Sequence, residues 1–205
     1  MELKVSELQI GYDKVLCTVD DLLFQPGKVY VLLGNNGLGK TTFFKTLAGL
    51  VPSLSGEVSL NDRKVIAGKA IAFVGTARPA IDYLTVRDYL SFGFASALDV
   101  KCQELLKEFQ LLELIDKNVE ELSDGQFRKL AVVRQLLKRP KVILLDEPSA
   151  FLDGENKRFL VKLFKSLKMS SIVILSTHDL HFAASCADQY LELKDKRISF
   201  VEKEN

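Results

Sequence analysis

The sequence predicts an α/β fold with a mixed sheet, and three observations support this prediction. Two runs, KVILLD and SIVILST, are apolar and rich in β-branched residues, a pattern typical of parallel strands buried on both faces. Strand-like runs of this kind alternate with stretches of helical periodicity, as in the α/β class. Hairpin signals in the first third of the chain and at its end indicate an additional antiparallel part.

The first half of the chain supplies a strand, a helix, a hairpin and a second strand. KVYVLLG (residues 28–34) predicts a buried strand closed by glycine, and a helix is expected from Lys40 to about Leu50. GEVSLNDRKV predicts a hairpin that turns at Asn61-Asp62. AIAFVG (residues 70–75) predicts another buried strand.

The second half of the chain begins with helices. Thr85 and Asp88 have the spacing of a capping box, so a helix is expected to start there. Residues 101–116 predict one or two amphipathic helices, and Ser123 is the expected N-cap of the next one. The helical block of about 78–138 lies between two predicted core strands and therefore indicates an inserted helical subdomain. QYLELKDKRISFVE predicts a terminal hairpin.

Composition narrows the class of protein. A chain of 205 residues, 47% of them hydrophobic, suits a single domain over residues 1–205. A net charge of +1 with well-mixed acids and bases argues against a nucleic-acid partner, which would require a basic stripe. Three dispersed cysteines argue against a disulfide framework and favour a reducing compartment. No signal peptide or membrane-spanning run is evident, so we expect a cytosolic protein that acts at a membrane only through a separate partner.

The segment GNNGLGKTT predicts a phosphate-binding loop, because it matches G-x-x-x-x-G-K-[ST] between a strand and a helix. Its glycines let successive backbone N–H groups converge on phosphate oxygens. Lys40 is expected to reach the β- and γ-phosphates, and the Thr41 hydroxyl to ligate Mg²⁺. The alternative is a glycine-rich turn with a chance Lys-Thr pair, which would be rare in this context. The residues of the loop are Gly34, Asn35, Asn36, Gly37, Leu38, Gly39, Lys40, Thr41 and Thr42.

Acidic residues and a histidine follow the two apolar strands. KVILLD ends in Asp146, which is expected at the carboxyl edge of the sheet, where it could hold Mg²⁺ through water. Glu147 comes next and could act as the general base toward an attacking water. His178 follows SIVILST at the same edge, which favours a contact with the γ-phosphate over a structural role.

Together the motifs resemble the nucleotide-binding domain of an ATP-binding cassette (ABC) ATPase over essentially the whole chain. They occur in the order Tyr12, GNNGLGKTT, LSDGQ, KVILLDEP, SAFLD and STHD. The resemblance implies a P-loop NTPase fold of the ABC type. This fold has a RecA-like core, an N-terminal antiparallel β part and an inserted α-helical subdomain. It also implies ATP hydrolysis with Mg²⁺, by two domains that trap two ATP molecules head to tail.

The resemblance also implies roles for single residues. Ser123, Gly125 and Gln126 would approach the γ-phosphate of the ATP bound by the partner subunit, and Asp153 would belong to the loop that crosses the dimer interface. Tyr12 would stack on adenine, although a packed aromatic side chain at the end of a strand is a serious alternative.

Four further positions complete the comparison with the family pattern. Glu147 would be the catalytic base and His178 the switch histidine. Thr76 stands where the family usually has a glutamine that helps to bind Mg²⁺ and senses the membrane subunit, so a metal contact is carried over to Thr76. Asp124 stands where glycine is commonest. Its carboxylate would repel the γ-phosphate unless it points away or caps its own helix.

The family contains several kinds of protein. The first hypothesis is the ATPase subunit of a transporter, with a second ATPase subunit, identical or different, and separate membrane permease subunits as partners. It would be peripheral on the cytoplasmic face of the membrane. LSDGQ with DEPSAFLD is similar to iron-chelate and cobalamin uptake ATPases, and the short chain also fits small export-type cassettes. Alternatives are a soluble ATPase of iron–sulfur assembly, and a module that binds nucleotide without hydrolysing it.

Overall fold

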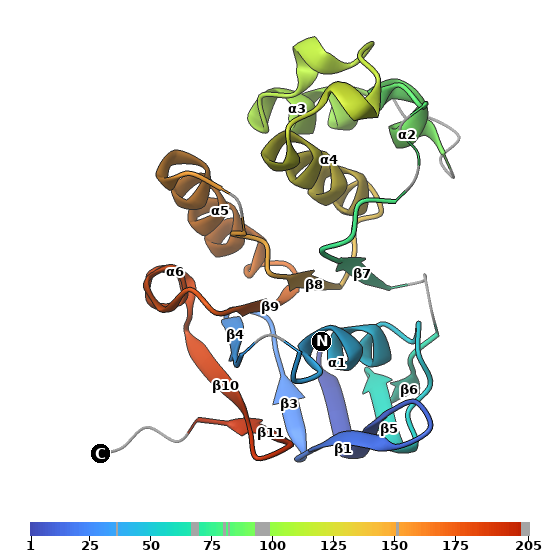
Figure 1. The fold of residues 1–205 in the computed structure, drawn as a ribbon, viewed down its shortest axis with the longest axis vertical. Helices are drawn as coiled ribbons and strands as arrows, with labels where there is room; N and C mark the ends of the chain where they lie inside the picture. The colour runs from blue at the N-terminus through green and yellow to red at the C-terminus, as the bar shows by residue number, and fades with distance from the viewer. Residues whose placement is uncertain are drawn as a thin grey trace. The chain divides into compact units, whose positions relative to one another are not determined.

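The computed structural model describes residues 1–35, 37–66, 70–79, 81, 83–92, 99–150 and 152–201. The chain divides into two compact units, one of residues 1–75 with 140–205 and one of residues 76–139. The first unit contains a large sheet with helices, and the second is helical (Figure 1). Asn36 of the predicted phosphate loop lies outside the described residues.

The sheet is mixed, as predicted. The antiparallel strands β1, β2, β3, β5 and β6 gather at one end, and β10, β4, β9, β8 and β7 run parallel at the other. The strand order is β6-β5-β1-β2-β11-β10-β4-β9-β8-β7, with β3 paired to β1. The strands are β1 (Leu3–Gly11), β2 (Val15–Val19), β3 (Leu22–Phe24), β4 (Val29–Leu33), β5 (Ser55–Leu60), β6 (Arg63–Lys64), β7 (Ile71–Val74), β8 (Val142–Asp146), β9 (Ile172–Thr177), β10 (Gln189–Lys194) and β11 (Arg197–Phe200).

Helices cover both faces of the parallel strands. Helix α1 (Lys40–Leu47) packs on one face, where its Phe43 and Phe44 join a core that includes Ile172 and Ile174 of β9. Successive side chains of a strand point to opposite faces, so the alternate residues of β9 face the other side. There α5 (Gly154–Leu167) and α6 (Leu180–Cys186) contact β9. Figure 1 shows α1 on one side of β8 and β9, and α5 and α6 on the other. The fully buried strands β8 and β9 confirm the prediction made from their apolar runs.

Both predicted hairpins of this unit are confirmed. Strands β5 and β6 turn at Asn61 and Asp62, whose φ values of 51° and 59° are those that a tight two-residue hairpin turn requires. Strands β10 and β11 form the terminal hairpin. The helix that starts at Lys40 ends at Leu47, so its predicted end at about Leu50 was too late. The chain turns there because Gly49 adopts a φ of 71°.

The helical unit contains α2 (Val86–Ser91), α3 (Val100–Glu108), α4 (Asp124–Leu136) and the 3₁₀ turns η1 (Leu112–Leu114) and η2 (Val119–Glu121). The predicted capping box of α2 is confirmed, because the Thr85 and Asp88 side chains each accept a hydrogen bond from the other's backbone N–H. Helix α3 and η1 confirm the helices expected in residues 101–116. Within the described parts of the chain, no helix is sufficiently long and apolar to cross a membrane.

Candidate functional site

The predicted phosphate loop lies between β4 and α1, at the carboxyl edge of the parallel strands. Gly37 and Gly39 have φ values of 82° and 111°, a region that side-chain-bearing residues adopt only with strain. Gly39 is also the N-cap of α1. The glycines of the motif therefore serve the backbone path that leads into the helix, whose first N–H groups are available to an anion.

Lys40 is the first residue of α1, and its side chain is buried, with 5% exposed. Its Nζ donates hydrogen bonds to the backbone oxygens of Gly34 (2.5 Å) and Asn35 (3.2 Å). The same nitrogen lies 3.2 Å from Oε1 of Glu147. The ammonium group thus lies inside the loop and pairs with the carboxylate that follows β8.

Asp146 ends β8 and is almost fully buried. Its Oδ2 accepts a hydrogen bond of 2.5 Å from the Thr41 hydroxyl, and its Oδ1 accepts one of 2.6 Å from the Ser176 hydroxyl. The Ser176 oxygen in turn accepts the backbone N–H of Glu147 at 3.1 Å. Ser176 is therefore a site residue that the sequence analysis missed. The available signal was its position as a polar residue near the end of an apolar strand parallel to β8.

Glu147 and His178 lie together beyond the strand ends. Oε2 of Glu147 is 3.0 Å from Nδ1 of His178, while Oε1 faces Lys40. Glu147 is buried, whereas 56% of the His178 side chain is exposed. The structure thus brings Lys40, Thr41, Asp146, Glu147 and His178 into one cluster of side chains.

Two further predicted residues lie in the sheet unit. The Tyr12 side chain follows β1 and is 58% exposed, so the alternative of a packed aromatic residue is wrong. Asp153 is the N-cap of α5, and its carboxylate accepts the backbone N–H of Asn156 at 2.8 Å. Both side chains are accessible to a ligand or a partner, but the structure gives neither a contact with the Lys40 cluster.

The remaining predicted residues belong to the helical unit. Ser123 and Gln126 form a capping box at the start of α4, with hydrogen bonds of 3.2 Å and 2.9 Å between the side chain of each and the backbone N–H of the other. Gly125 lies in the first turn of the same helix. Thr76 lies in this unit too, and its metal contact stays a prediction.

Asp124 is the first residue of α4 and not its cap, so the hypothesis that it caps its own helix is wrong. Its Oδ1 lies 3.7 Å from a guanidinium nitrogen of Arg78. Arg78 also donates hydrogen bonds to the backbone oxygens of Val119 and Leu122 and covers the ring of Phe127 at 4.8 Å. Arg78 therefore binds the turn that leads into α4 and partly neutralises Asp124.

The donor set at the end of β8 fits Mg²⁺. This ion is held in proteins by one or two carboxylates and hydroxyls together with phosphate oxygens and water. Thr41 and Asp146 already lie in mutual contact and supply one hydroxyl and one carboxylate. No three histidine, cysteine or acidic side chains gather as a metal site in the described part of the chain.

A phosphate loop that follows β4 of a mixed sheet, with Asp146 and Glu147 at the end of β8 on the far side of β9, defines a P-loop NTPase. More narrowly, the chain belongs to the ABC transporter family, whose model matches residues 19–150. The uncharacterized ABC transporter ATP-binding protein YxlF of Bacillus subtilis is 34% identical over 82% of this chain and 59% of its own. The zinc import ATP-binding protein ZnuC of Halorhodospira halophila is 33% identical over 85% of this chain and 66% of its own.

Solved structures agree with this assignment. The structure of cbiO1 from Clostridium perfringens, described as part of the ABC transporter complex cbiONQ, has a TM-score of 0.78 and 26% identity. The match covers 96% of this chain and 86% of cbiO1. By contrast, the chain spans about three fifths of the length of YxlF. The family match and the likeness to cbiO1 together show that the fold is that of an ABC nucleotide-binding domain.

Proposed function

We propose that this protein is the ATP-binding and ATP-hydrolysing subunit of a membrane ABC transporter. The observation that carries the proposal is the cluster of Lys40, Thr41, Asp146, Glu147 and His178 at the carboxyl edge of the sheet. Membership of the ABC transporter family supports it, as do relatives named for zinc import and for a transporter complex.

Nucleotide binding would use the loop and Lys40. The Lys40 ammonium group is now satisfied by two loop carbonyls and by Glu147. The β- and γ-phosphates would replace these acceptors, because phosphate oxygens carry more charge than peptide oxygens. Mg²⁺, held by Thr41 and Asp146, would supply neutralisation of the phosphate charge. Tyr12 would stack on the adenine ring.

Hydrolysis would depend on Glu147. Once the phosphates draw Lys40 away, Oε1 of Glu147 is available to accept a proton from the attacking water. The contact between Oε2 and Nδ1 of His178 would hold the carboxylate in place during this step. Ser176 would orient Asp146 and the backbone of Glu147 through its two hydrogen bonds.

Two copies, or this chain and a different ATPase subunit, would form the working dimer. Ser123, Gly125 and Gln126 would then approach the γ-phosphate bound by the partner subunit, with Asp153 at the interface between the subunits. The dimer would dock on separate permease subunits at the cytoplasmic face of the membrane, and Thr76 would contribute to the metal site and to this contact. The whole chain would thus act as one nucleotide-binding domain without a nucleic-acid partner.

Replacement of Glu147 by Gln tests the assignment of the base. We expect the variant to bind ATP and to form a more stable dimer, while turnover falls by on the order of a hundredfold or more. Glu155→Gln is the matched control, since Glu155 is an exposed acid in the first turn of α5 and should leave turnover unchanged. Normal hydrolysis by the Glu147 variant would show that this residue is not the base.

Transport is tested by co-purification from detergent-solubilised membranes. We expect a polytopic membrane protein to accompany the chain and its transport substrate to stimulate ATP hydrolysis. Loss of this stimulation in Glu147→Gln, with the complex still intact, would link the two activities. If no candidate membrane partner binds the chain or stimulates ATPase activity, the transport assignment fails.

A further inference from the structure

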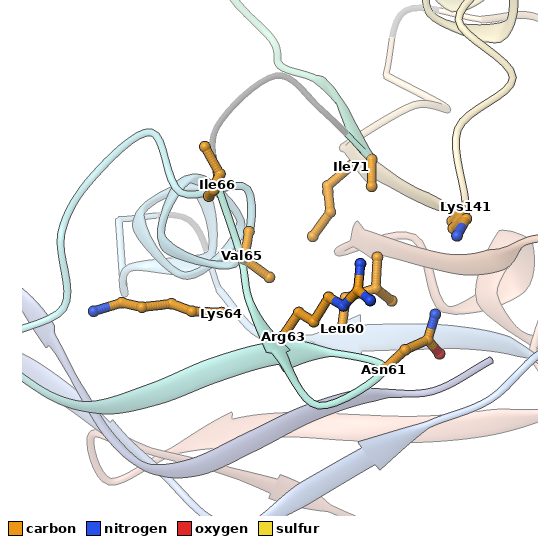
Figure 2. Close-up of a pocket in the computed structure, with 9 residues that line it drawn as sticks. Leu60, Asn61, Arg63, Lys64, Val65, Ile66, Ile71 and Lys141 are labelled. Carbon is orange, nitrogen blue, oxygen red and sulfur yellow. The ribbon is translucent and has the colours of Figure 1, made fainter.

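A cavity lies in the sheet unit, away from the phosphate loop. It has a volume of about 610 Å³, and its walls come from the hairpin of β5 and β6 and from the residues that open β7 and β8 (Figure 2). Ala70 precedes β7 and Lys141 precedes β8, so the cavity lies at the amino ends of these parallel strands. Asp146 marks the opposite, carboxyl end of β8. The cavity is therefore distinct from the proposed nucleotide site.

The polar side chains of this cavity offer donors without acidic partners. Arg63 and Lys141 line it, and they form no ion pair with any acid in the described residues. Two acids at the hairpin turn, Asp62 of the turn itself and Glu2, whose backbone N–H binds Asn61, are both bound by Lys4 at 2.8 Å. These acids are therefore already paired with another cation.

Asn61 adds a neutral donor. Its side-chain oxygen accepts the backbone N–H of Glu2 at 3.0 Å, which fixes the orientation of the amide and leaves its NH₂ group available to a ligand. In Figure 2, Arg63 extends toward Leu60 and Asn61, whereas Lys64 points away from them. The polar part of the cavity thus presents Asn61, Arg63 and Lys141, all of which suit an anionic oxygen.

The rest of the cavity is apolar. Leu60 and Ile71 line it and are buried, and Val65, which also lines it, packs against the same hydrophobic core. Ile66 also lines the cavity, yet 61% of its surface is exposed to water. A ligand with an apolar body would cover Ile66 and gain from the removal of that surface from water. The volume of the cavity lies within the range of small-molecule sites.

From this arrangement we infer that the cavity binds a small amphipathic anion, an apolar body that carries one carboxylate or phosphate group. The headgroup would bind to Arg63, Lys141 and the amide of Asn61, and the apolar body would lie against Ile66 and Ile71. A free inorganic anion would lack the apolar contacts with Ile66 and Ile71. A neutral amphiphile would lack the charged contacts with Arg63 and Lys141. Both contributions together define the ligand class.

Calorimetric titration of the full chain with octanoate and octyl phosphate tests the inference and distinguishes the two headgroups. We expect saturable binding of at least one of them at one site, with at least tenfold weaker binding of octan-1-ol and of inorganic phosphate. The double variant Arg63→Gln with Lys141→Gln should weaken binding at least tenfold, and so should Ile66→Asn. Lys194→Gln removes an exposed cation elsewhere in the same unit and should bind like the wild type.

Two outcomes would overturn the inference. Equal binding by the wild type and the Arg63/Lys141 variant would show that the cavity is not the site. Loss of octyl phosphate binding in Lys40→Ala would assign the signal to the phosphate loop instead. The titrations contain no ATP, so they succeed or fail independently of the proposed ATPase activity. Thermal unfolding of each variant confirms that it is folded.

Discussion

Arg78→Ala should destabilise the start of helix α4, although Arg78 is not part of the hydrophobic core. The substitution removes charged hydrogen bonds to the backbone oxygens of Val119 and Leu122, the contact with the Phe127 ring and the ion pair with Asp124. A hydrogen bond from a charged group contributes about 1.5–3 kcal/mol, and a partly exposed cation–π contact about 1 kcal/mol.

These contributions are not additive, and the 3.7 Å ion pair with a largely exposed Asp124 adds little. We therefore expect Arg78→Ala to lower the free energy of unfolding of the helical unit by about 3 kcal/mol. The matched control is Arg87→Ala, whose ion pair with Asp116 is shorter, at 2.6 Å, but joins two exposed side chains. That substitution should cost about 0–1 kcal/mol.

Urea unfolding of both variants, with hydrogen exchange of the α4 amides as a local readout, measures the two effects. The exchange of these amides should accelerate in Arg78→Ala and stay near the wild-type rate in Arg87→Ala. If the two variants lose the same stability, then the network of Arg78 contributes no more than a surface ion pair and the reasoning fails. Asp124→Gly should lose less than Arg78→Ala, because it leaves the carbonyl contacts intact.

Three other predictions concern the sheet unit. Lys40→Ala should lose ATP binding in a direct titration, because the variant lacks the ammonium group that now binds two loop carbonyls and is proposed to bind the phosphates. Unchanged affinity would contradict this. Burial raises the pKa of Cys17 and of Cys186 to about 11, so both thiols should react slowly with a disulfide reagent at pH 8 until the chain unfolds. A hydrogen bond from Lys157 lowers the pKa of Asp179 from its usual value of 3.8. The pair therefore stabilises the fold above pH 3.8, and this stabilisation is lost as the pH falls through the lowered pKa. In Lys157→Met the Asp179 carboxyl should titrate at higher pH by NMR, and an unchanged midpoint would refute the coupling.

Local signals in the sequence predicted much of the fold. The capping box of α2, the N-cap of α4 at Ser123 and the turn at Asn61-Asp62 involve residues within a few positions of each other, so their geometry follows from spacing and residue type. The buried strands β8 and β9 were equally clear, because they are apolar throughout.

Long-range contacts were beyond the reach of such signals. Ser176 meets Asp146 across 30 positions, and Arg78 meets Val119 and Leu122 across 41 and 44. The phosphate loop and Asp146 were predictable because a motif and an apolar strand mark them. Nothing near Arg78 indicates that its guanidinium binds the turn before α4, because that contact depends on how the chain packs in three dimensions.

Glu147 follows β8 with a φ of 48°, a left-handed conformation that costs a side-chain-bearing residue on the order of 1 kcal/mol. Glycine would remove this cost, but it would also remove the carboxylate that faces Lys40 and His178. If Glu147 is the general base proposed above, backbone strain and turnover favour different residues at this one position. Under that proposal, a laboratory selection that scores only folded protein would not keep Glu147, so a screen for robust variants has to score ATP consumption as well.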